Sequence, residues 1–212
     1  MHRLRFPALL ILAVTVAAPV TWADSLTIIP DYVAQRWMQP LIFHQPGMLD
    51  SGPEVQATTL QSGFVVDFSG TQPLTTTADG VGVMTSTTFS FTSLTIKPNR
   101  PGATFTDYGF NVNTVDGASG KLTITVNLLN GNPITETFAI GKGQNYFTIL
   151  AADGQEITGI SLSSTTALRG VGMDRIGGVL TPSAPEPASL FLFGSGLAGL
   201  GACLRRRRRS KS

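Results

Sequence analysis

Few side chains in this 212-residue sequence have the chemistry of a catalytic centre. The chain has two histidines, His2 and His44, and a single cysteine, Cys203. A Ser-His-Asp relay would have to use His44, which lies in a loop flanked by proline and glycine, and no serine of the middle region sits in a G-x-S-x-G motif. No His-Glu-x-x-His motif or histidine cluster is present to bind zinc or iron. The sequence therefore predicts no catalytic residues and a protein that is not an enzyme.

Carboxylates and amides offer two weaker possibilities. Paired carboxylates could serve a glycan hydrolase, and the candidates are Asp107 with Asp116, Asp153 with Glu156, and Asp174. Asp116 and Asp153 precede glycines, however, where turns favour aspartate. Loop oxygens at one end of a β-sandwich could instead bind calcium, although no EF-hand spacing is present. No metal site is predicted, and the side chains that could supply oxygens to calcium are Asp107, Asn111, Asn113, Asp116 and Asp174.

Aromatic side chains could stack on sugar rings, and Trp37, Tyr108, Tyr146 and Phe147 are the candidates. The competing interpretation, which the sequence favours, is that phenylalanine and tyrosine on alternating strands belong to the core.

The elements that must position these side chains are predicted to be short β-strands. Residues 122–128 alternate strictly between apolar and polar side chains, and similar runs occur at 64–68, 87–97, 108–112, 135–140, 146–150, 157–162 and 175–180. Asp-Gly and Asn-Gly turn signals separate several of them. We expect an all-β fold, a two-sheet antiparallel β-sandwich or jelly roll, over residues 63–181. Residues 24–62 are expected to be irregular, with one short strand at 26–29 and a helical turn at 32–38.

Charge is distributed unevenly along the chain. Two basic residues precede residue 24 and six follow residue 204. The region from Asp24 to Pro187 therefore contains seven Lys and Arg and all 13 Asp and Glu, which gives it a net charge of −6. An acidic domain repels phosphate backbones, which disfavours nucleic acid as a partner.

The N-terminus has the pattern of a secretory signal peptide over residues 1–23. Two arginines precede an apolar run from Phe6 to Val20, and Ala23 and Asp24 form the predicted cleavage site. Cleavage after Ala18 and an uncleaved anchor helix are the alternatives. The run is shorter than the roughly 20 residues that span a bilayer, which favours the signal peptide.

The C-terminus, residues 182–212, changes character again. A proline-rich linker leads into the uncharged run Leu190–Leu204, for which we expect a short transmembrane helix. A block of five arginines follows and is predicted to stop transfer and stay cytoplasmic, namely Arg205, Arg206, Arg207, Arg208 and Arg209.

Pro185, Glu186 and Pro187, followed by a short glycine-rich apolar segment and an arginine-rich end, resemble the PEP-CTERM sorting signal. The resemblance implies recognition of Pro185, Glu186 and Pro187 by an exosortase, a membrane-embedded transpeptidase. It also implies transient anchoring in the inner membrane of a Gram-negative-type bacterium that makes exopolysaccharide or biofilm matrix. A plain tail anchor is the alternative.

Residues 105–180 also look like jelly-roll modules of the carbohydrate-binding type, in runs such as GKLTITVNLLNG. We therefore expect an exported, non-enzymatic surface or matrix protein, processed through the exosortase after passing the Sec translocon and associated with exopolysaccharide. A carbohydrate-binding module is the alternative, followed by an extracellular glycan hydrolase. No cofactor other than calcium is considered.

Overall fold

The computed structural model describes residues 25–182, apart from 34, 78, 81 and 86–89. Within this part every regular element except one 3₁₀ turn, η1 (Val115–Gly117), is a β-strand. The eleven strands are β1 (Leu26–Ile29), β2 (Gln39–Ile42), β3 (Ser51–Thr59), β4 (Val65–Thr76), β5 (Gly82–Thr85), β6 (Phe91–Pro98), β7 (Asp107–Thr114), β8 (Gly120–Leu128), β9 (Ile134–Ile140), β10 (Asn145–Ala151) and β11 (Ile157–Gly177). The predicted all-β antiparallel fold is confirmed.

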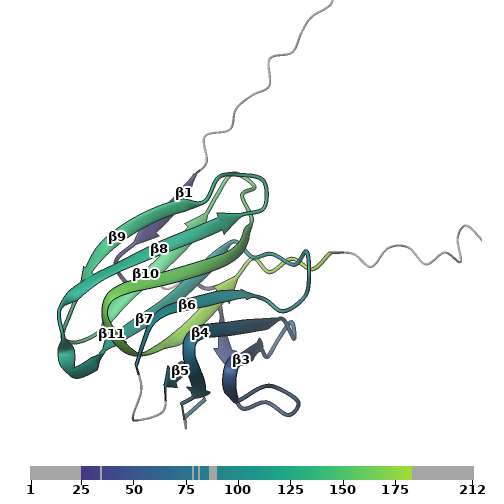
Figure 1. Cartoon of the computed structure of the whole chain (residues 1–212). Helices are drawn as coiled ribbons and strands as arrows, with labels where there is room; N and C mark the ends of the chain where they lie inside the picture. The colour runs from purple at the N-terminus through teal and green to yellow at the C-terminus, as the bar shows by residue number, and fades with distance from the viewer. Residues whose placement is uncertain (1–24, 34, 78, 81, 86–89, 183–212) are drawn as a thin grey trace, which may run out of the picture.

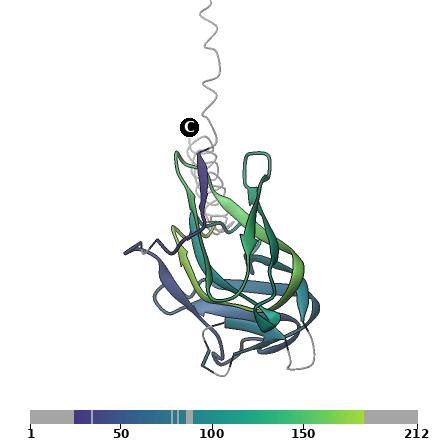
Figure 2. The same cartoon turned by 90° about the vertical axis from the view of Figure 1, so that its left-hand side faces the viewer.

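The long strand β11 joins the two layers of the sandwich. Its first part, residues 157–164, pairs with β8 and β6, whereas its later part, residues 168–177, pairs with β7, β5 and β2. One layer therefore runs β9, β8, β11, β6, β4, and the other runs β1, β10, β7, β11 (Figures 1 and 2). Because β3 pairs with both β2 and β4, the hydrogen bonding is continuous between the layers.

The core fills the space between these layers. Residues that alternate along β8, such as Leu122, Ile124 and Val126, are fully buried, as the strict alternation predicts. Phe138 of β9 packs on Phe147 of β10 with ring centroids 5.3 Å apart, which joins the layers at the end farthest from β4. Burial of this many aliphatic and aromatic side chains stabilises a domain that has no disulfide.

Two local expectations are wrong. Within residues 24–62 the expected strand at 26–29 is present as β1, but β2 and β3 were not expected, and the described residues of 32–38 form no helix. The runs 157–162 and 175–180 are not two strands, because β11 continues through 163–174.

The two Asp-Gly turns have the conformation expected of them, whereas neither Asn130 nor Gly131 has a positive φ. Asp116 and Gly117 have φ values of 52° and 69°, and Asp153 and Gly154 have values of 55° and 79°. These left-handed conformations are the ones that Asp-Gly pairs favour. In the part of the chain that the structure describes, no helix has the length and apolar character of a membrane span. The expected signal peptide and transmembrane helix lie outside the described residues.

Candidate functional site

The candidate site is built on a β-bulge in β11. Two residues, Met173 and Asp174, lie opposite the single residue Phe110 of β7, between regular pairs on either side. Met173 has a φ of 56°, a left-handed conformation that costs a non-glycine residue about 1–2 kcal/mol. The bulge sends the two side chains in different directions: Met173 is 50% exposed and Asp174 only 2%. Bulges commonly re-aim side chains next to functional sites.

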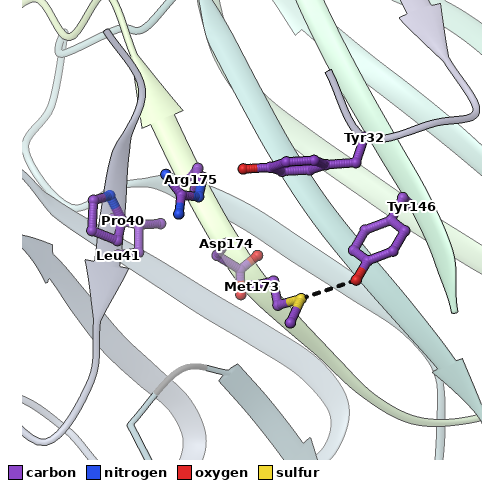
Figure 3. Close-up of a pocket in the computed structure, with 7 residues that line it drawn as sticks. All are labelled: Tyr32, Pro40, Leu41, Tyr146, Met173, Asp174 and Arg175. Atoms are coloured by element: carbon purple, nitrogen blue, oxygen red, sulfur yellow. Dashed lines mark hydrogen bonds between the residues drawn. The ribbon is translucent and has the colours of Figure 1, made fainter. Parts of the chain in front are cut away.

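These side chains line a pocket of about 470 Å³, which we call the tyrosine pocket. Figure 3 shows Asp174 and Arg175 on β11, between the two residues of β2 and the two tyrosines, with the hydroxyl of Tyr32 pointing toward Arg175. The full lining comprises Tyr32, Pro40, Leu41, Tyr146, Met173, Asp174 and Arg175.

The two tyrosines are held side by side, with ring centroids 5.7 Å apart and planes tilted by 54°. Tyr146 belongs to β10, and its hydroxyl lies 3.3 Å from the sulfur of Met173. Tyr32 lies on the loop after β1, which the buried hydroxyl of Thr148 fixes on β10. That hydroxyl donates to the carbonyl of Asp31 at 2.8 Å and accepts from the backbone N–H of Val33 at 3.0 Å.

Asp174 is the most unusual polar group of the pocket. Its Oδ1 accepts a hydrogen bond from the hydroxyl of Tyr108, while its buried Oδ2 has no hydrogen-bond partner. Burial raises the pKa of Asp174 to about 7, against the lowering effect of the Tyr108 hydrogen bond. Burial and the neighbouring Asp174 raise the pKa of Tyr108 well above its usual range, so Tyr108 remains the donor. A buried carboxyl oxygen without a partner costs stability, which marks it as a candidate ligand contact.

The lining of the tyrosine pocket is better suited to binding a sugar than to hydrolysing a glycosidic bond. A glycosidase uses two carboxyl groups on either side of the scissile bond. Among the lining residues, Asp174 is the one carboxylate. Aromatic rings, a thioether and a guanidinium around a single carboxyl group are instead suited to holding a polyhydroxylated ring through stacking and hydrogen bonds.

The five predicted calcium candidates are not gathered at one point. Asp107, Asn111 and Asn113 are spread along β7, and at about 3.4 Å per residue the first and last lie about 20 Å apart. Asp107 accepts hydrogen bonds from Trp37 Nε1 at 3.1 Å and Thr106 Oγ1 at 2.6 Å. No three His, Cys, Asp or Glu side chains of residues 25–182, as far as they are described, are grouped to hold a metal ion. Calcium binding stays a prediction.

The other candidate residues have structural roles. His44 ties two loops together, through Asp50 at 3.2 Å and the backbone carbonyl of Thr77 at 2.9 Å. The hydrogen bond that its ring donates to the Asp50 carboxylate raises the pKa of this exposed histidine. Of the aromatic candidates, Tyr108 and Phe147 are core residues, whereas Tyr146 lines the pocket.

Sequence reasoning missed Tyr32, Met173 and Arg175. Only the aromatic character of Tyr32 was a usable signal, because the bulge that exposes Met173 is set by pairing with β7. The predicted cleavage residues Ala23 and Asp24, the recognition residues Pro185, Glu186 and Pro187, and the arginines of the tail lie outside the described residues.

Comparisons with solved structures found two similar chains. One is a family 29 carbohydrate-binding module, with 12% identity over 73% of this chain and 87% of that chain, at a TM-score of 0.27. The other is a mutant module of the same family in complex with mannohexaose, with 11% identity over 73% of this chain and 90% of that chain, also at 0.27. This similarity is too low to assign a fold or a ligand. No curated protein matches the chain.

The family comparison concerns the C-terminal tail. Residues 183–208 match the PEP-CTERM protein-sorting motif, and this range contains Pro185, Glu186, Pro187 and the first four arginines of the block. The motif implies an exported protein that passes through a membrane-anchored stage before an exosortase processes it. The chain therefore combines an all-β domain with a PEP-CTERM sorting tail.

Proposed function

We propose that this protein is a non-enzymatic surface or extracellular-matrix component whose β-sandwich binds a glycan, such as the exopolysaccharide of a biofilm, through the tyrosine pocket. The observation that carries the proposal is the bulge at Met173 and Asp174. It places a buried carboxyl group with an unpartnered oxygen beside two tyrosines.

Each group of the pocket has a role in such binding. The apolar face of a sugar ring packs on Tyr146 and Tyr32, whose tilted rings form two walls. A sugar hydroxyl pairs with Oδ2 of Asp174, donating to the ionised group and accepting from the protonated one, which removes the penalty of the unpartnered oxygen. Arg175, which has no described ion pair, donates to a ring or hydroxyl oxygen.

Export prepares the domain for this role. The Sec translocon carries the chain outward and the signal peptide is removed after Ala23. The exosortase then acts at Pro185–Pro187, while the apolar segment holds the protein transiently in the inner membrane. The product is displayed on the cell surface or released.

Intact-mass measurement of the protein from medium, cell surface and membrane fractions tests the export steps. A species that begins at Asp24 and ends near Pro185–Pro187 supports both cleavages. A membrane-bound species that still carries Leu190–Ser212 would contradict processing by an exosortase and favour a permanent tail anchor.

Glycan binding is tested with the full chain in mild detergent and a panel of neutral and acidic hexasaccharides. Tyr146→Ala should weaken binding about tenfold, because it removes one stacking wall. Leu60→Ala removes an exposed apolar side chain from a turn outside the pocket and serves as the control. Equal affinities of Tyr146→Ala and the wild-type protein would exclude the tyrosine pocket as the glycan site.

A further inference from the structure

A second pocket, of about 620 Å³, adjoins the tyrosine pocket. Met173 lines both pockets, and the hydroxyl of Tyr146 in the first donates a hydrogen bond to the side chain of Gln144 in the second. A chain-like ligand that fills the tyrosine pocket can therefore continue into this neighbour. We call it the basic groove, after the two cationic side chains Lys142 and Arg169.

The side chains of Lys142 and Arg169 are available to bind a ligand. Both side chains are exposed. The one salt bridge found among the described residues joins His44 to Asp50 and involves neither of them. Asp79 is the single acidic residue of the groove lining, and its carboxylate accepts a hydrogen bond of 2.5 Å from Thr77 Oγ1. Together with Arg175 of the tyrosine pocket, three of the seven cations of an acidic domain line these two pockets.

The loop that carries Lys142 is fixed in place. The Asn145 side chain donates to the carbonyl of Gly141 at 3.1 Å and accepts from the backbone N–H of Gly141 at 3.1 Å. The backbone N–H of Asn145 donates to Asn111 Oδ1 of β7 at 2.8 Å. A preorganised loop loses less conformational entropy when its lysine binds a ligand.

We propose that the basic groove makes the protein specific for anionic glycans: Lys142 and Arg169 bind a carboxylate or sulfate on the sugar next to the one in the tyrosine pocket. This inference rests on the proposed glycan-binding function. The groove lining carries two cations and one carboxylate, that of Asp79, so its net charge is positive and attracts an anionic ligand. A neutral glycan can accept hydrogen bonds from these side chains but gains no charge attraction, so the groove favours the anionic class.

Matched hexasaccharides test the proposal by calorimetry on the full chain at about 20 mM NaCl, where screening is weak. The pairs are β-1,4-mannohexaose with its mannuronate counterpart and cellohexaose with its 6-carboxylated counterpart. A sulfated cellohexaose distinguishes sulfate from carboxylate. The anionic member of at least one pair should bind about tenfold more tightly than the neutral one.

The double variant Lys142→Gln/Arg169→Gln should lose this preference and keep its affinity for the neutral member within about twofold. The control Lys121→Gln/Arg100→Gln changes the net charge equally, at exposed residues outside the groove, and should keep the preference. Equal loss in both double variants would mean that the overall field causes the preference, and would overturn the assignment to the groove.

Failure of the inference is distinguishable from failure of the proposed function. If Tyr146→Ala weakens binding but the anionic and neutral members bind equally to the wild-type protein, glycan binding stands and the anionic specificity is refuted. If no hexasaccharide of either kind binds, both are refuted.

Discussion

Replacement of Asp174 by asparagine should remove most of the pH dependence of stability above pH 4. In the folded chain the pKa of Asp174 is about 7, against an ordinary value of 3.8, because the group is buried. One pKa unit corresponds to about 1.4 kcal/mol, so ionisation of Asp174 lowers the free energy of unfolding by about 4 kcal/mol.

The sign follows from the protons bound in each state. Below about pH 4 the carboxyl group is protonated in both states and pH has no effect through it. Between about pH 4 and 7 the folded chain keeps the proton that the unfolded chain has lost, so stability falls as pH rises. Above about pH 7 both states are ionised and the full penalty is present.

The asparagine side chain of the Asp174→Asn variant does not titrate and can still accept the hydrogen bond of Tyr108. We therefore expect the melting temperature of this variant relative to wild type to rise by about 10 °C between pH 4 and 8, at about 2–4 °C per kcal/mol for a domain of this size. Differential scanning calorimetry across this range measures it. The control Asp116→Asn removes an equal charge at an exposed turn, and its melting temperature should change with pH in the same way as that of the wild type. Parallel curves for Asp174→Asn as well would refute the buried-carboxyl argument.

Four further outcomes are expected. Met173→Gly should raise the free energy of unfolding by about 1 kcal/mol, because glycine adopts the left-handed conformation freely. The same change should weaken glycan binding. Thermal melts measure the first effect and calorimetry the second. Thr148→Val should lower stability by about 1–3 kcal/mol, because it leaves the carbonyl of Asp31 and the N–H of Val33 without their partner; unchanged denaturant midpoints would argue against this clamp on the Tyr32 loop. Glu186→Ala should leave an unprocessed chain in the membrane fraction, seen as an intact C-terminus by mass spectrometry, whereas normal processing would show that Glu186 is not recognised. Calcium binding predicts a higher melting temperature in millimolar calcium than in chelator, and identical curves would remove calcium from consideration.

The strand that the sequence made most clearly predictable is one whose burial alternates within the segment. Residues 122–128 show this pattern because one face of β8 packs on the core and the other carries half-buried threonines. The strand β2, with the sequence Gln-Pro-Leu-Ile, has no such signal; its pairing with β11 and β3 is a tertiary effect. The middle of β11 was missed for a related reason, since Gly170 and Gly172 favour a turn when the partner strand is unknown.

The sequence indicates some residues of the site but not how they are brought together. Asp174 and Tyr146 could be nominated from residue type alone, as a carboxylate and an aromatic of the domain. That they share a pocket with Tyr32 depends on which residue of β11 is bulged and on how Thr148 fixes a loop about 115 residues away in sequence. Neither the register nor this hydrogen bond leaves a local pattern in the chain.

The position of β11 as the last strand has a consequence for biogenesis. A chain that crosses the membrane from its N-terminus delivers β2, β5, β6, β7 and β8 to the outside before the strand that pairs with all five. Until residue 177 has emerged, these strands have unsatisfied edges that can pair with other chains. We expect the sorting tail, which begins only a few residues later, to reach the membrane at about the time the sandwich can close. Because the sorting tail directly follows β11 in the sequence, the sandwich can finish folding at about the time that the tail becomes available for processing.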